Sequence, residues 1–233
     1  MKITKLVLLT LATLSLAACG GDTSSSGSTQ GSTTSSSVPS VCMTKEDFDA
    51  FINKVRTEGL TASFTQKALV EGVALSETVG VCAYNVPLCE LKTEVSQKMG
   101  TMQMSMGEVI KNLDHYQNEG TGYKKAEKKL TQEEAKHIVE EDIKGMFTNF
   151  FPELDFTKYS VDNVNSTIKI VGKYEVEPGT FADTEFTYTV VNKLITKFEG
   201  IQAAVSGGQT IEQHVEVTSF VAGAATIEAP EIK

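Results

Sequence analysis

Residues 168–190 read IKIVGKYEVEPGTFADTEFTYTV, and this stretch decides the fold class. Apolar side chains alternate with polar ones in both of its halves. A period of two is typical of a β-strand that buries one face. The stretch therefore predicts two strands with a shared apolar face. The inward-facing residues of this face are Ile168, Ile170, Tyr174, Phe186, Tyr188 and Val190.

The strand pattern continues toward the C-terminus. Asn192 and Lys193 predict a tight reversal into a strand over residues 194–202, and Gly207 and Gly208 predict another into residues 209–221. Successive strands joined by short turns pair antiparallel. The C-terminal half is therefore expected to form an antiparallel meander.

Two helices are predicted ahead of this meander. Thr44 and Asp47 have near capping-box spacing, and Gly59 ends the first helix. Thr131 and Glu134 form a second capping box, followed by apolar residues at helical spacing up to Pro152. The expected fold class is α+β, with N-terminal helices followed by a curved antiparallel sheet.

Residues 88–118 carry two conflicting patterns. Apolar residues step by three and four, as in a long amphipathic helix, and we expect a helix here. However, Gly100 and Gly107 interrupt it, and methionines 102, 104 and 106 alternate with polar residues as a strand would. The hairpin alternative therefore remains open.

Residues 131–202 resemble the NTF2-like superfamily, in particular its SnoaL-like members. A helix that closes on Phe151-Pro152-Glu153-Leu154-Asp155-Phe156 leads into strands, and Asn192-Lys193-Leu194-Ile195 follows at a turn. The resemblance implies a curved sheet wrapped into a cone around an apolar pocket, and it makes the six inward-facing residues, Ile168, Ile170, Tyr174, Phe186, Tyr188 and Val190, the expected pocket-lining residues. Enzymes of that family need an acid or base aimed into the pocket. Here the inward candidates include two tyrosines and no such group, so no catalytic residue is assigned and a SnoaL-like isomerase or cyclase is only an alternative.

The N-terminus has the pattern of an export signal. Lys2 and Lys5 precede an apolar run over residues 6–18, which is shorter than a membrane span. Leu16-Ala17-Ala18-Cys19 resembles the lipobox of bacterial lipoproteins, and the resemblance implies that Cys19 is acylated. We expect residues 1–18 to be a signal peptide and the mature protein to be anchored in the cell envelope, on the outer membrane, by its lipid.

Residues 19–40 are rich in Ser, Thr and Gly and hold one charged side chain, Asp22. Such a chain is a flexible tether with a reach of about 25 Å. Residues 41–228 are expected to form a single globular domain, and residues 229–233 a short tail.

Three cysteines remain after Cys19. Cys82 and Cys89 bracket a short loop with Pro87 and are the preferred disulfide pair. The two pairings through Cys42 stay open.

Composition excludes one class of partner. The chain has 233 residues, with 21 basic against 30 acidic side chains and a net charge of −9. Nucleic-acid binding needs clustered cations, so no nucleic-acid partner is expected. No cofactor motif is found either.

The methionines at positions 99, 102, 104 and 106 are an unusual cluster. Thioethers select Cu(I), so the cluster is a candidate copper site, although methionine is more often a core filler. The main prediction is a non-enzymatic lipoprotein that binds a small apolar ligand or another envelope protein. A Met-rich Cu(I)-binding periplasmic protein is the alternative.

Overall fold

The computed structural model describes residues 43–150, 159–162, 165–177, 180–206 and 209–232. The predicted signal peptide, the lipobox and the tether lie outside the described residues, as do Cys42 and the turn at Gly207 and Gly208.

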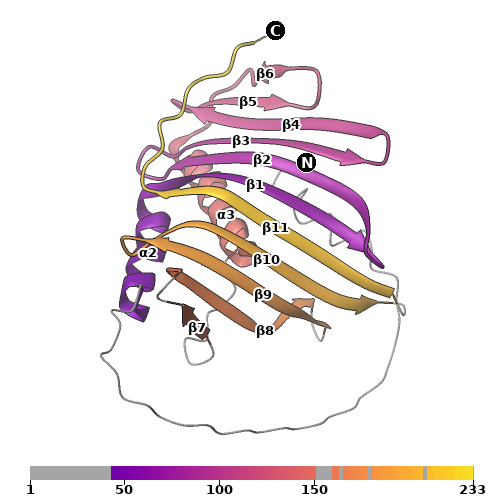
Figure 1. Cartoon of the computed structure of the whole chain (residues 1–233). Helices are drawn as coiled ribbons and strands as arrows, with labels where there is room; N and C mark the ends of the chain where they lie inside the picture. The colour runs from indigo at the N-terminus through magenta and orange to yellow at the C-terminus, as the bar shows by residue number, and fades with distance from the viewer. Residues whose placement is uncertain (1–42, 151–158, 163–164, 178–179, 207–208, 233) are drawn as a thin grey trace, which may run out of the picture.

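In the part of the chain that the structure describes, one antiparallel sheet of eleven strands dominates the fold (Figure 1). Its spatial order is β6-β5-β4-β3-β2-β1-β11-β10-β9-β8-β7. Two meanders therefore meet where the first strand pairs with the last. The strands are β1 (Gly59–Val70), β2 (Val73–Asn85), β3 (Glu90–Met99), β4 (Met102–Lys111), β5 (Asp114–Asn118), β6 (Tyr123–Lys125), β7 (Tyr159–Asp162), β8 (Thr167–Glu177), β9 (Thr180–Val191), β10 (Leu194–Ser206) and β11 (Gln209–Ala222).

Two helices formed by described residues lie on one face of this sheet, which we call the inner face (Figure 1). The first is α2 (Lys45–Glu58), and both hydrogen bonds of the predicted box between Thr44 and Asp47 are present. The second is α3 (Gln132–Phe150), where Glu134 N donates to Thr131 Oγ1 over 3.2 Å and Thr131 N donates to Glu134 Oε2. Both predicted helices are confirmed.

The helix predicted over residues 88–118 is wrong. This stretch forms β3, β4 and β5, with Val95 opposite Met106 and Ile110 opposite His115. Gly100 takes a φ of 58° at the turn between the first two strands, and Asn112 and Leu113 have positive φ at the next turn. These residues provide the tight reversals that a hairpin needs.

The predicted fold class is also wrong. Residues 45–125 contribute one helix and six strands to the described structure, rather than a set of helices. The strands expected from residues 168–221 are present, but β11 pairs with β1 along its length. The C-terminal meander is therefore half of a larger open sheet and does not form an NTF2-like cone.

The main core fills the space between the inner face and the helices. Its aromatic centre comes from α2 and from strands at the middle of the sheet: the Tyr188 ring lies 5.5 Å from that of Phe198, and the Phe51 ring lies 5.6 Å from that of Phe220. A smaller cluster lies on the opposite face, the outer face, where the C-terminal segment buries Ala225 and Ile227 against Val109 and Tyr116. Among the described residues, neither helix has the length and hydrophobicity of a membrane span.

Candidate functional site

Two glutamines mark a polar site on the inner face. Gln202 of β10 and Gln213 of β11 are register partners. Gln202 lies two residues beyond Gly200, and Gln213 lies two residues before the buried Val215, so both side chains alternate onto the inner face. We call these two residues the glutamine pair.

The glutamine pair holds an unused donor and an unused acceptor. Gln202 Nε2 and Gln213 Oε1 are both buried, and neither atom has a hydrogen-bond partner among the described residues. Buried polar groups in folded proteins are almost always hydrogen-bonded. Because the two residues are register partners, the free donor and the free acceptor make the glutamine pair a candidate site for a polar group of a ligand.

The surroundings of the glutamine pair are neutral. Across the strands, Gln202 pairs with Thr184 on one side, and Gln213 pairs with Ala68 on the other, which in turn pairs with Ser76. Ser76 and Thr184 are buried. Two residues further toward the hairpin ends, the inner face carries three half-buried apolar residues, Val70, Ile211 and Ala204. The site thus combines uncharged hydrogen-bonding groups with an adjoining apolar strip.

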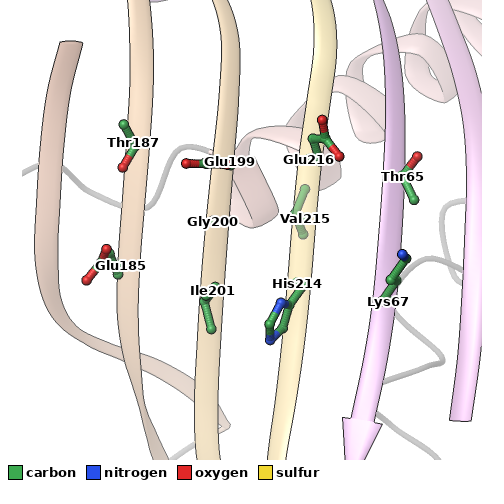
Figure 2. Close-up of a pocket in the computed structure, with 10 residues that line it drawn as sticks. All are labelled: Thr65, Lys67, Glu185, Thr187, Glu199, Gly200, Ile201, His214, Val215 and Glu216. Carbon is green, nitrogen blue, oxygen red and sulfur yellow. The ribbon is translucent and has the colours of Figure 1, made fainter. Parts of the chain in front are cut away.

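A shallow groove lies on the outer face of the same strands (Figure 2). It has a volume of about 320 Å³. Its walls carry charged side chains, and Glu199 and Glu216 lie at the same level on β10 and β11 with their carboxylates directed apart (Figure 2). The lining residues are Thr65, Lys67, Glu185, Thr187, Glu199, Gly200, Ile201, His214, Val215 and Glu216.

Most charges in this groove are already paired. Lys67 Nζ lies 3.3 Å from Glu77 Oε1, Lys169 Nζ lies 2.6 Å from Glu185 Oε1, and His214 Nε2 donates to Glu212 Oε2 over 2.8 Å. His214 is thus directed along its own strand and toward no nucleophile. Within the described part of the chain, no cluster of three His, Cys, Asp or Glu side chains is arranged to hold a metal ion.

The residues predicted to line a pocket belong mainly to the core. Ile168, Phe186, Tyr188 and Val190 are on the inner face, and each is at most 2% exposed. Burial raises the pKa of the Tyr188 phenol far above its ordinary value, so this group stays protonated. The side chains of Ile170 and Tyr174 lie outside the described residues.

The predicted disulfide between Cys82 and Cys89 is not formed in the structure, where both are free, buried thiols. Cys82 lies inside β2 opposite Thr93, whereas Cys89 lies in the turn just before β3. Cys89 lies four residues before Thr93, which displaces it along the hairpin by about 13 Å from the position opposite Cys82, at about 3.3 Å per residue. A disulfide tolerates a Cα separation of at most about 7 Å. Burial raises the pKa of the Cys82 thiol to about 12, which makes it a weak nucleophile.

The four methionines fall into two environments. Met106 is partly buried and packs against the core, whereas Met99, Met102 and Met104 are exposed on the β3–β4 hairpin. The predicted cluster is thus brought together on one hairpin, with three of its members outside the packed interior.

No protein-family model matches the chain, and no curated protein sequence does. Among solved structures, the chain is similar to the crystal structure of LprF from Mycobacterium bovis, with a TM-score of 0.41 and 8% sequence identity. The match covers 80% of this chain and 95% of that one.

The glutamine pair was not predicted from the sequence. Each glutamine is a single polar residue in an otherwise ordinary strand, with no characteristic spacing between them. Only the register of β10 on β11 places them side by side.

Proposed function

We propose that this protein is a non-catalytic, membrane-tethered binding protein whose ligand has an apolar body and one neutral polar group. The observation that carries this proposal is the buried donor of Gln202 beside the buried acceptor of Gln213, both without a partner among the described residues.

A hydroxyl group fits the glutamine pair. It accepts a hydrogen bond from Gln202 Nε2 and donates one to Gln213 Oε1, so that a single atom satisfies both amides. Leaving a buried polar group without a partner costs about 1–3 kcal/mol. A ligand that displaces water from the glutamine pair must therefore supply these two hydrogen bonds itself.

The charge around the glutamine pair argues for a neutral ligand. The side chains nearest to it on its register line are Ala68, Ser76 and Thr184, and Met99 and Met102 follow beyond Ser76; none of these carries a charge. A buried carboxylate or ammonium without an opposite charge is strongly disfavoured. The ligand class is thus an uncharged amphiphile, such as a monoacylglycerol, rather than a fatty acid.

The apolar strip beside the glutamine pair supports an amphiphile over a small polar molecule. Val70, Ile211 and Ala204 are neighbours across β1, β11 and β10, and each is only half-buried. An alkyl chain that covers them gains about 25 cal/mol for each Å² of apolar surface removed from water.

The tether is proposed from the sequence. Cys19 in Leu16-Ala17-Ala18-Cys19 supplies the acylation site, and residues 19–40 supply a flexible connection to the envelope membrane. This arrangement keeps the binding site close to a bilayer, which is the source of an amphiphilic ligand.

Binding of an envelope protein is a weaker alternative. The exposed apolar residues of the outer face, such as Val79 and Ile201, have polar cross-strand neighbours, Thr65 and His214. A specific protein interface needs a larger continuous patch than this arrangement provides.

Displacement of a fluorescent monoacylglycerol tests the proposal. Unlabelled monoacylglycerol is expected to compete at least about tenfold better than the fatty acid of the same chain length at pH 7.4, because only the acid introduces a buried charge. The double variant Gln202→Leu and Gln213→Leu is expected to lose at least about tenfold in affinity.

The matched control is Gln103→Leu. Gln103 is exposed and donates to Ser96 Oγ over 3.2 Å, away from the inner face, so its replacement leaves binding unchanged. Equal competition by the fatty acid, or wild-type affinity in the double variant, would overturn the proposal.

A further inference from the structure

The tip of the β3–β4 hairpin presents three methionines on one face. Met99 and Met102 are register partners at the last pair of the hairpin, and Met104 follows Met102 by two residues. Because side chains alternate along a strand, Met102 and Met104 lie on the same face, and Met99 shares it as the partner of Met102.

These three methionines are not packing residues. They are 45%, 67% and 48% exposed, in chain order, whereas Met43 and Met146 are buried in the core. Methionine is normally a buried residue that fills gaps in a core. Three large apolar side chains gathered in water on one hairpin therefore require another explanation than core packing.

Their spacing allows the three sulfurs to reach one centre. Directly opposite residues of an antiparallel pair have Cβ atoms about 4.5–5.5 Å apart, and diagonal neighbours lie about 7–8 Å apart. A methionine side chain has three rotatable bonds, so its sulfur moves over several ångströms at little cost. Exposure leaves these rotations free.

The neighbouring residues define the kind of ion. The cross-strand partner of Met104 is Gln97, and that of Met99 on the other side is Ser76. Neither carries a charge, and the described residues contain no metal-binding cluster of His, Cys, Asp or Glu. Neutral thioethers alone are poor ligands for Zn²⁺, Mg²⁺ or Ca²⁺, but they are preferred by soft monovalent ions such as Cu(I).

We propose that Met99, Met102 and Met104 form a three-thioether site for Cu(I). Binding requires no change in oxidation state and no proton release, because the ligands are neutral. The site lies three strands away from Gln213, or about 14 Å at the usual strand spacing, on the same face of the sheet, with Ala68 and Ser76 between Gln213 and Met99.

The experiment is a titration of the full chain, labelled with ¹³C at the methionine methyl groups, with Ag(I) in air and with Cu(I) under anaerobic conditions. The methyl resonances of Met99, Met102 and Met104 are expected to shift together and to saturate at one equivalent. Those of Met43 and Met146, which are buried, are expected to stay in place.

A matched pair of variants completes the test. Met102→Leu, at the most exposed of the three positions, is expected to weaken binding at least tenfold without affecting folding. Met146→Leu, in the core, is expected to leave the affinity unchanged. Independent shifts of single methionines that need excess metal, or unchanged affinity in Met102→Leu, would overturn the proposal.

Discussion

The ring of Phe186 occupies the space that a side chain on Gly200 would need. Phe186 and Gly200 are register partners on β9 and β10, and a Cβ built on Gly200 overlaps the Phe186 ring. The ring in turn stacks on Tyr188, with centroids 6.0 Å apart and planes inclined by 15°. A glycine in the middle of a strand here allows an aromatic side chain to lie flat across its neighbour.

Gly200→Ala is therefore expected to destabilise the protein by about 1–3 kcal/mol, the usual cost of overpacking a core. Urea unfolding measures this change. The same substitution in a Phe186→Leu background is expected to cost less, because the smaller side chain yields space. An equal cost in both backgrounds would show that the overlap with the ring is not the cause.

The ion pair of Glu90 and Lys111 is expected to contribute more to the free energy of unfolding than a similar, more exposed pair nearby. Glu90 is 3% exposed, and its Oε2 lies 2.9 Å from Lys111 Nζ. Lys111→Met leaves that carboxylate buried without its cation, which costs about 3 kcal/mol.

Lys92→Met is the control for this variant. Lys92 Nζ lies 3.1 Å from Glu94 Oε2, but both side chains are about two-fifths exposed. Exposed pairs contribute below about 1 kcal/mol. Urea unfolding is expected to show a larger loss in the free energy of unfolding for Lys111→Met than for Lys92→Met. Similar losses in the two variants would contradict the burial argument.

The state of the cysteines can be tested directly. Because Cys82 and Cys89 are offset along the β2–β3 hairpin and both are buried, peptide mapping without reductant is expected to recover them as separate thiols. Neither is expected to react with iodoacetamide at pH 8 until the protein is unfolded. A peptide linked between Cys82 and Cys89 would contradict the register of this hairpin.

The elements that can be predicted from the sequence are those whose capping residues or alternation of apolar and polar residues match the buried and exposed positions of the fold. The capping boxes at Thr44 and Thr131 locate both helices, because the box satisfies backbone donors at a helix start in any context. The alternation around Phe186 and Tyr188 locates the C-terminal strands, because their inward residues are apolar and their outward ones polar.

The same logic fails in β3 and β4. Their inward positions include Thr93, Gln97 and Glu108, which are buried polar residues that interrupt the apolar alternation. The remaining apolar residues then fall four apart, as at Leu91 and Val95, which imitates a helix. The glutamine pair cannot be predicted from the sequence for a related reason, because the two residues become neighbours only when β10 pairs with β11.

The most direct test of the central claim is an NMR titration of the side-chain amides with a monoacylglycerol kept below its aggregation concentration. The account predicts that the amide resonances of Gln202 and Gln213 shift and saturate together, while that of Gln103 on the outer face does not move. Resonances of Gln202 and Gln213 that stay unperturbed at saturating ligand, or that shift no more than that of Gln103, would contradict it.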